Sequence, residues 1–193
     1  MRVFVAGASG AIGRVLVPML VDAGHEVAGM TRKEERAELI AAVGATPVVC
    51  DVYDYGLTAA LADFGPEVVI NEITDLPAKM AMFPLKIKGL NRARTKGNDA
   101  LIAAAKAAGA TQFIAQSVAF KSPSIVGGAI EHLEAATLAY PGVVLRYGYF
   151  YGLGTWYPDG TKQEPRVQVE YAAKRTVEFL TAESGVCEIV DPA

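Results

Sequence analysis

Residues 2–13 read RVFVAGASGAIG, an apolar run from Arg2 to Ala6 that leads directly into three glycines spaced three apart. Gly7 allows a sharp turn off a strand, Gly10 has no Cβ to hold a phosphate away from the backbone, and Gly13 lets the following helix lie close to the sheet. Free amides in the first turn of that helix then face the phosphate, at the positive end of the helix dipole. The stretch therefore predicts a dinucleotide site; the alternative is a tight strand-to-helix turn without a ligand.

Apolar runs and helical stretches alternate along the rest of the chain. We expect seven strands, at Arg2–Ala6, Glu26–Met30, Thr46–Cys50, Glu67–Ile70, Gln112–Gln116, Val143–Tyr147 and Val186–Val190. We expect six helices between them, at Ala11–Ala23, Lys33–Val43, Leu57–Phe64, Leu85–Ala108, Gly127–Tyr140 and Val169–Glu183. Such alternation forms right-handed crossovers around a parallel sheet. The predicted fold class is therefore α/β, a doubly wound parallel sheet (Rossmann fold) in one domain over residues 1–193, with an irregular loop or small subdomain at Gly152–Arg166.

Composition excludes several classes of protein. The chain has 193 residues, of which 52% are hydrophobic, enough for one domain with a substantial core. Its net charge of −3 argues against a nucleic-acid surface, and it has neither an apolar run long enough for a membrane span nor a leader before the first strand. These features predict a cytoplasmic protein without membrane or nucleic-acid partners. Cys50 and Cys187 are each expected to be small buried side chains, and no metal site is predicted.

The residue that follows the second strand predicts the choice of dinucleotide. A site specific for NAD usually has an acidic residue here for the adenosine ribose, and none is present. Arg32 can instead neutralise a 2′-phosphate, which favours NADP over NAD as the cofactor. The alternative is an ordinary solvated helix start, an interpretation that we keep for residues 34–36. After the third strand, Asp51 either accepts a hydrogen bond from the adenine amino group or caps the turn that follows it.

Taken together, these segments resemble the short-chain dehydrogenase/reductase superfamily, in its extended and atypical NAD-dependent epimerase/dehydratase-like branch. The resemblance covers nearly the whole chain. It rests on Gly7–Gly13, Asp51-Val52, 71–77 (NEITDLP), 94–101 (RTKGNDAL), Ala115-Gln116-Ser117 and 145–152 (LRYGYFYG), together with 167–173 and 188–191 near the C-terminus.

The resemblance implies a role for individual residues in cofactor binding. Residues that would hold the pyrophosphate are Gly7, Ser9, Gly10, Ala11, Ile12 and Gly13. Residues for the rest of the cofactor are Arg32 at the 2′-phosphate, Asp51 and Val52 at the adenine, Ile73 and Thr74 at the ribose, Ser117 facing the nicotinamide, and the backbone of Tyr147–Tyr149 beside its carboxamide.

The chain departs from the superfamily in its catalytic residues. Members usually use a tyrosine whose pKa is lowered by a lysine four residues later, because a free tyrosine is a poor base at neutral pH. Val126 and Ile130 occupy those positions here. Ser117 is retained, and Tyr149 is the preferred substitute proton donor. The other candidates are Tyr151, Lys121 and His132, although a lone helical histidine is more often structural.

The substrate side of the site is predicted to be small. The branch usually carries a substrate lobe between and beyond its last two strands, whereas only residues 151–185 lie between Phe150 and Val186 here. The aromatic residues of 147–157 either line an apolar substrate cleft or pack the strand end.

Two functions remain open at this point. The first is an NAD(P)-dependent oxidoreductase with hydride transfer on a small carbonyl or alcohol, or epimerase/dehydratase-like chemistry. It would act on a small-molecule substrate, and a homodimer partner could complete so shallow a site. The second is a non-catalytic sensor of dinucleotide redox state.

Overall fold

A parallel sheet of seven strands forms the centre of the computed structural model, which describes residues 1–77, 80–122 and 124–192. The strands are β1 (Arg2–Ala6), β2 (Glu26–Thr31), β3 (Thr46–Val49), β4 (Val68–Asn71), β5 (Gln112–Val118), β6 (Gly142–Tyr147) and β9 (Gly185–Ile189). Their order is β3-β2-β1-β4-β5-β6-β9, and every pair is parallel. The order changes direction between β1 and β4, so the loops after these strands separate and leave a crevice at their carboxyl ends. The predicted doubly wound fold is confirmed.

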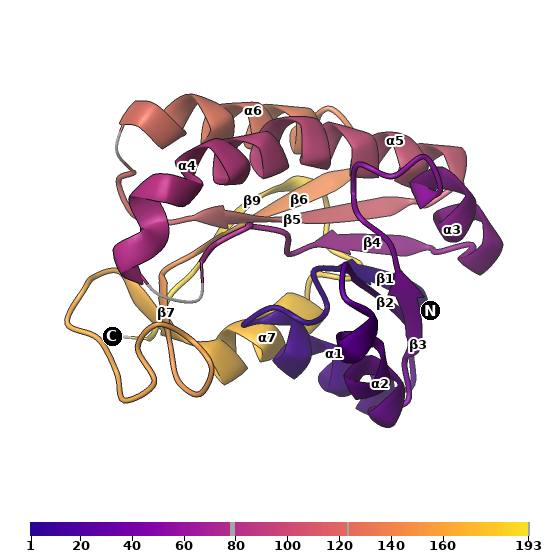
Figure 1. Ribbon diagram of the computed structural model, residues 1–193, viewed down its shortest axis with the longest axis horizontal. Coiled ribbons are helices and arrows are strands. Elements are labelled where there is room, and N and C mark those ends of the chain that lie inside the picture. Colours follow the sequence, from indigo (N-terminus) through magenta and orange to yellow (C-terminus); the bar gives the residue numbers. More distant parts are fainter. Residues whose placement is uncertain (78–79, 123, 193) are drawn as a thin grey trace.

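Helices cover both faces of the sheet (Figure 1). One layer is formed by α1 (Gly13–Asp22), α2 (Glu34–Ala42) and α7 (Val169–Val177), and the other by α3 (Leu57–Phe64), α4 (Phe83–Arg92), α5 (Asn98–Ala107) and α6 (Ser124–Leu138). Neighbouring residues of β1 belong to different buried clusters: Val5 packs in the cluster that contains Leu16 of α1, and Phe4 in the cluster that contains Leu101 of α5. The central strands are therefore buried on both faces, as in other doubly wound sheets.

Several segments differ from the sequence prediction. The edge strand β3 is mostly exposed and the edge strand β9 is only partly buried, whereas burial on both faces was expected. The helix expected over Leu85–Ala108 is interrupted by a five-residue π-helix, η2 (Ala93–Gly97), and is preceded by a short 3₁₀ turn, η1 (Met80–Met82). The late helix ends at Val177, earlier than the expected Glu183.

A second, two-stranded parallel sheet was not predicted. It pairs β7 (Tyr149–Tyr151) with β8 (Arg166–Gln168), and the loop between them covers most of the stretch expected to be irregular. Among the residues that the structure describes, no helix combines the length and apolar composition needed to cross a bilayer.

Candidate functional site

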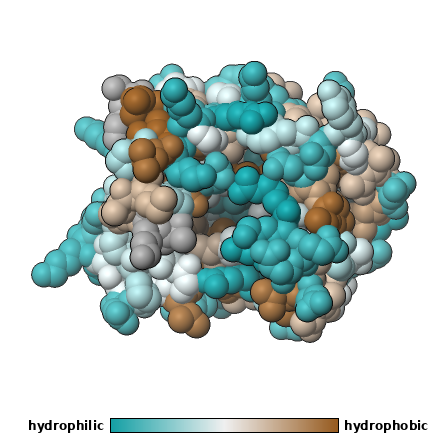
Figure 2. Space-filling view, viewed as in Figure 1, coloured by the Kyte–Doolittle hydropathy of each residue, from teal (hydrophilic) through white to brown (hydrophobic). Residues whose placement is uncertain are grey.

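A cavity of about 940 Å³ lies at the carboxyl ends of the parallel strands. It runs from the loop after β1, past the ends of β2 and β4, to the ends of β5 and β6 and the loop after β7. Figure 2 shows a hollow in the middle of this face, bordered mostly by hydrophilic residues. The volume suits a cofactor-sized ligand, and the place is the one where doubly wound sheets bind ligands.

The glycine loop forms one wall of the cavity, and its three glycines have different roles. Gly7 has a φ of +85°, and a Cβ there would lie 2.8 Å from the carbonyl oxygen of Glu72. A Cβ at Gly13 would overlap the Gly7 carbonyl oxygen. At Gly10 a Cβ would press only on that same oxygen, at 3.1 Å. Gly7 and Gly13 are therefore required by the fold, whereas Gly10 leaves room on the cavity side of the loop.

The loop also presents hydrogen-bond donors. In the described part of the chain, the amides of Ala11 and Ile12 donate to no protein acceptor, and both residues directly precede α1. Arg14, in the first turn of α1, donates to the carbonyl oxygen of Leu153 (3.3 Å) and so connects this wall to the loop after β7. Free amides at a helix start favour an anion such as a pyrophosphate.

Positive charge dominates the cavity wall although the whole chain carries a net charge of −3. The cationic residues in the wall are Arg14, Arg32, Lys33, Arg36, Arg92, Arg94 and Lys121, and the acidic ones are Asp51, Glu72 and Asp75. This concentration of cations attracts an anionic ligand.

The end of β2 brings together hydroxyl and guanidinium groups. The side-chain oxygens of Ser9 and Thr31 lie 3.0 Å apart, and the guanidinium of Arg36 lies 3.4 Å from both the carbonyl and the hydroxyl oxygen of Ser9. Arg32 forms ion pairs with Asp75 at 3.0 Å and with Asp51 at 3.9 Å. Arg36 is exposed at the start of α2, as predicted, and its contact with the glycine loop is a feature that the sequence did not indicate.

The residues after β3 contribute one carboxylate and two largely apolar side chains to the cavity wall, namely Asp51, Val52 and Tyr53. Asp51 accepts a hydrogen bond from the Tyr53 amide at 3.1 Å, so its turn-capping role is present. Val52 is buried and lines the cavity beside Tyr53, whose ring is covered by the Arg92 guanidinium at 3.8 Å. Contact between Asp51 or Val52 and an adenine stays a prediction.

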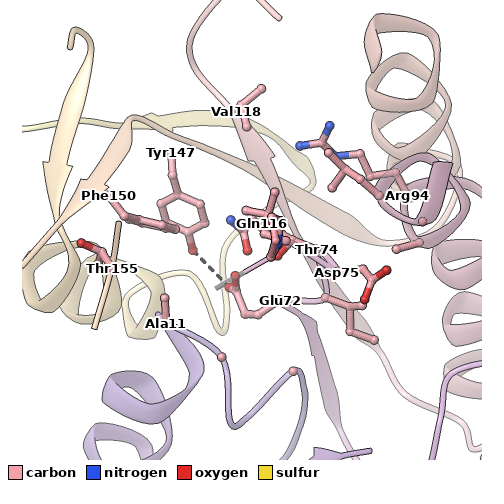
Figure 3. Close-up of a pocket in the computed structure, with 18 of the residues that line it drawn as sticks. Ala11, Glu72, Thr74, Asp75, Arg94, Gln116, Val118, Tyr147, Phe150 and Thr155 are labelled. Carbon is pink, nitrogen blue, oxygen red and sulfur yellow. Dashed lines mark hydrogen bonds between the residues drawn. The ribbon is translucent and has the colours of Figure 1, made fainter. Parts of the chain in front are cut away.

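The end of β4 holds a buried carboxyl group that sequence reasoning did not single out. Burial raises the pKa of Glu72 to about 8, because the effect of burial is larger than the lowering effect of the hydrogen bond from Tyr147. The Tyr147 hydroxyl lies 3.3 Å from Glu72 Oε1 and 2.7 Å from Thr176 Oγ1 (Figure 3). Glu72 Oε2 is buried and has no hydrogen-bond partner among the residues that the structure describes. Ile73 and Thr74, the predicted ribose contacts, follow it and line the cavity.

The end of β5 places Ser117 as predicted, but its hydroxyl is engaged. Ser117 is buried, lines the cavity and donates to Glu134 Oε1 at 2.6 Å. Arg146 lies opposite Ser117 on β6 and donates two hydrogen bonds to the same carboxylate, from Nε to Oε1 at 2.9 Å and from Nη2 to Oε2 at 2.6 Å. Burial alone would raise the pKa of Glu134, but the hydrogen bonds from Arg146 and Ser117 outweigh it, so the pKa is lowered. The serine oxygen is thereby fixed in place.

Tyr149, the predicted proton donor, lines the cavity with its ring stacked on Phe120, the centroids 3.8 Å apart. Partial burial, with a smaller contribution from Tyr157, raises the pKa of its hydroxyl. The group therefore keeps its proton at neutral pH and can donate it, but cannot act as a base. The backbone carbonyl of Tyr147, predicted to border the carboxamide, accepts a hydrogen bond from the Ala119 amide at 2.9 Å.

The aromatic residues of the loop after β7 both pack and line the cavity. Trp156 donates from its indole nitrogen to the Pro77 carbonyl oxygen at 2.8 Å, and its ring meets Phe83 edge to face. Tyr157 approaches the Met80 sulfur at 3.7 Å. All of these residues also belong to the cavity wall, so the packing alternative is present, and a role in a substrate cleft stays a prediction.

The remaining candidates are distributed as follows. Val126, at the position of the missing tyrosine, is buried and lines the cavity. Lys121 is exposed and also lines the cavity. His132 binds Asp99 at 2.9 Å on the outer surface, which fits a structural role. Cys50 and Cys187 are half-buried rather than buried. Within 1–77, 80–122 and 124–192, no group of three or more histidine, cysteine or acidic residues has the arrangement of a metal site.

Comparison with known families identifies the family of the chain. Residues 7–137 match the model of a family described as NAD(P)H-binding. The chain belongs to this family. The match begins at the first glycine of the loop.

Individual relatives agree with this assignment. A protein from Streptomyces sp named 3-diazoavenalumate denitrifying reductase is 35% identical, over 81% of this chain and 59% of its own length. A sterol-4-alpha-carboxylate 3-dehydrogenase, decarboxylating, from Dictyostelium discoideum is 34% identical over 36% of this chain and 21% of its own length. This chain thus spans about three fifths or less of the curated relatives that it matches.

Solved structures share the fold over the whole chain. A putative NAD-dependent epimerase/dehydratase from Bacillus halodurans superposes with a TM-score of 0.81 at 20% identity, covering 100% of this chain and 94% of that one. The Bordetella bronchiseptica enzyme WbmH, in complex with NAD+, gives 0.80 at 16% identity and covers 100% and 76%. At these identities the likeness shows the fold alone.

The residues present fit a nicotinamide dinucleotide. Gly10 leaves space at the loop, the amides of Ala11 and Ile12 are free, and cations line the wall. The pyrophosphate would be held by this loop and the adenosine by the ends of β2 and β3.

Proposed function

We propose that this chain is an NADP-preferring oxidoreductase, in which the bound nicotinamide exchanges a hydride with a small carbonyl or alcohol substrate. The observation that carries the proposal is the single cavity that joins the glycine loop and its arginines to Ser117 and Tyr149. The Streptomyces relative, named a reductase, supports the reductive direction.

The preference for NADP rests on the end of β2. Ser9, Thr31 and Arg36 converge there, with Arg32 beside them, and the strand ends in threonine rather than an acidic residue. Arg32 already pairs with Asp75, so part of its charge is compensated. Within the described residues the Arg36 guanidinium contacts oxygens of Ser9 and forms no ion pair, so it is the stronger candidate for a 2′-phosphate contact.

The catalytic roles follow from the geometry at the ends of β5 and β6. The Ser117 hydroxyl donates a hydrogen bond to Glu134. The lone pairs of the serine oxygen therefore stay available to accept a hydrogen bond from a substrate hydroxyl. Tyr149 keeps its proton and donates it to the substrate oxygen when a carbonyl is reduced. Its stacking on Phe120 holds the ring in one orientation.

The test is NADPH oxidation with a panel of aldehydes, ketones and quinones. Tyr149→Phe should reduce turnover by about 10² to 10⁴, the contribution of a general acid, and leave NADPH affinity unchanged. Tyr55→Phe is the matched control, because Tyr55 is fully exposed and should have no effect. Turnover that survives Tyr149→Phe would refute this assignment, and Lys121 would become the better candidate.

A second function is favoured by one specific observation. The positions of the usual tyrosine and lysine are occupied by Val126 and Ile130, which cannot transfer protons. A redox sensor would bind NADPH and NADP⁺ with different affinities, turn over no substrate of the panel, and change its association with a partner protein when the cofactor is exchanged.

The proposal includes a cytoplasmic location and a homodimer. Exposed apolar side chains on α4 and α6, namely Leu85, Ile125 and Leu138, support self-association. Analytical ultracentrifugation of the wild-type chain tests the homodimer, since sedimentation as a monomer at all concentrations would refute it.

A further inference from the structure

Arg94 is a buried arginine whose side chain has no partner among the described residues. Its exposed fraction is 7%, and burial is the only influence that acts on its pKa, with no hydrogen bond or ion pair to its guanidinium in the described ranges. Figure 3 shows the guanidinium pointing from the helical segment into the cavity, on the side away from Ala11 of the glycine loop.

The charge of Arg94 is costly to keep. Burial lowers its pKa to about 10, so the guanidinium is still cationic at neutral pH. An unpaired buried charge destabilises a fold unless a ligand compensates it. Arg94 also lies in η2, the π-helical interruption between α4 and α5, and such interruptions are frequent at functional sites.

The surroundings define the ligand. Leu90 lies one helical turn before Arg94, and the apolar Val118 and Val126 line the same cavity. The guanidinium of Arg94 balances one negative charge and presents two parallel donors, which matches a carboxylate. The stacked Phe120 and Tyr149 add a flat apolar wall to this cavity.

We propose that Arg94 binds the carboxylate of the substrate, which is therefore a small carboxylic acid with a planar apolar body. This inference rests on the proposed function of the same cavity and specifies its substrate class. Arg94 acts by binding and orienting the substrate, while the proton still comes from Tyr149.

The test uses benzoate as the probe and benzamide as its neutral counterpart, each titrated calorimetrically with and without saturating NADPH. Benzoate should bind the wild-type chain and benzamide should bind it more weakly. Arg94→Met should weaken benzoate binding about tenfold to a hundredfold and leave NADPH affinity unchanged. Arg94→Lys should recover part of the lost benzoate affinity, because lysine restores the positive charge but not the two parallel donors of the guanidinium. Lys88→Met, at an exposed position of α4, is the matched control and should change nothing.

Thermal unfolding without ligand gives a second readout. Arg94→Met should raise the midpoint, because it removes an uncompensated buried charge, and benzoate should raise the midpoint of the wild type only. Failure of benzoate, cinnamate and acetate to bind the wild type would overturn the proposal, as would benzoate binding that survives Arg94→Met. Loss of NADPH binding in Arg94→Met would assign the residue to the cofactor instead. Failure of the wild type to bind NADPH would refute the proposed function itself, whatever the benzoate titration shows.

Discussion

Replacing Glu72 by glutamine should remove a strong pH dependence of stability. Glu72 is fully buried between the glycine loop and Tyr147, and its pKa is about 8 instead of the ordinary 4.5. Thr176 already donates its proton to the Ala172 carbonyl, so the Tyr147 hydroxyl has one proton for two acceptors, Thr176 and Glu72. A protonated Glu72 resolves this shortage because it can donate to the phenol oxygen. Glutamine keeps the shape and the donor and removes the titration.

The sign and size of the effect follow from proton linkage. Between pH 4.5 and about 8 the folded protein holds a proton on Glu72 that the unfolded chain has released. Its contribution to stability is therefore lost as pH rises through this window, by about 1.4 kcal/mol per pH unit for one proton. The whole window corresponds to a loss of roughly 5 kcal/mol as an upper limit. Above about pH 8 the wild type carries an ionised, buried carboxylate and is at its weakest.

Urea unfolding of the wild type and of Glu72→Gln at a series of pH values measures this directly. The difference in unfolding free energy should favour the variant increasingly from pH 5 to pH 8, and NADPH should bind both proteins. Glu38→Gln, at an exposed position of α2, is the matched control and should follow the wild type at every pH. A difference between wild type and Glu72→Gln that is constant with pH would show that the carboxyl is ionised throughout, and the account of this site would be wrong.

Two further variants test the cofactor end of the cavity. Gly10→Val should stay folded by circular dichroism, because its Cβ presses on one oxygen only, and it should lose dinucleotide binding, because its side chain enters the cavity. Gly13→Val should instead disrupt the loop, because its Cβ would overlap the Gly7 carbonyl oxygen. Normal NADPH binding by a folded Gly10→Val protein would place the pyrophosphate elsewhere. Arg36→Met should weaken NADPH binding about tenfold to a hundredfold and leave NADH binding unchanged, while Lys106→Met on the exposed side of α5 changes neither. Equal losses for NADPH and NADH would exclude Arg36 as a 2′-phosphate contact.

The fold could be predicted because its signals are local. Strand and helix periods, and the glycines after β1, determine the doubly wound sheet without knowledge of distant contacts. The π-helix η2 and the strands β7 and β8 could not be predicted in this way. Their backbone is set by tertiary packing, as where Tyr149 donates its amide to the Pro165 carbonyl oxygen at 2.8 Å.

The site was predictable where a motif carries it and not elsewhere. Gly7, Ser9, Gly10 and Ala11 of the glycine loop line the cavity, as do Arg32, Ser117 and Tyr149, whereas Ile12 and Gly13 are not part of its lining. The roles assigned to these residues stay predictions. Glu72 was not singled out because a carboxyl after a strand normally faces solvent, and only the structure shows it buried against Tyr147. Arg94 was seen as part of a helix motif, but neither its burial nor its missing partner is visible in sequence.

The affinities of the wild-type chain for NADPH and for NADH, titrated by protein fluorescence at one salt concentration, decide between the two cofactors. NADPH should bind about tenfold to a hundredfold more tightly than NADH, since a charge-assisted contact to phosphate contributes about 1.5–3 kcal/mol. Arg32→Asp should narrow or reverse the difference. Equal affinities for the two cofactors would contradict the preference for NADP, and binding of neither would contradict the assignment of the cavity as a dinucleotide site.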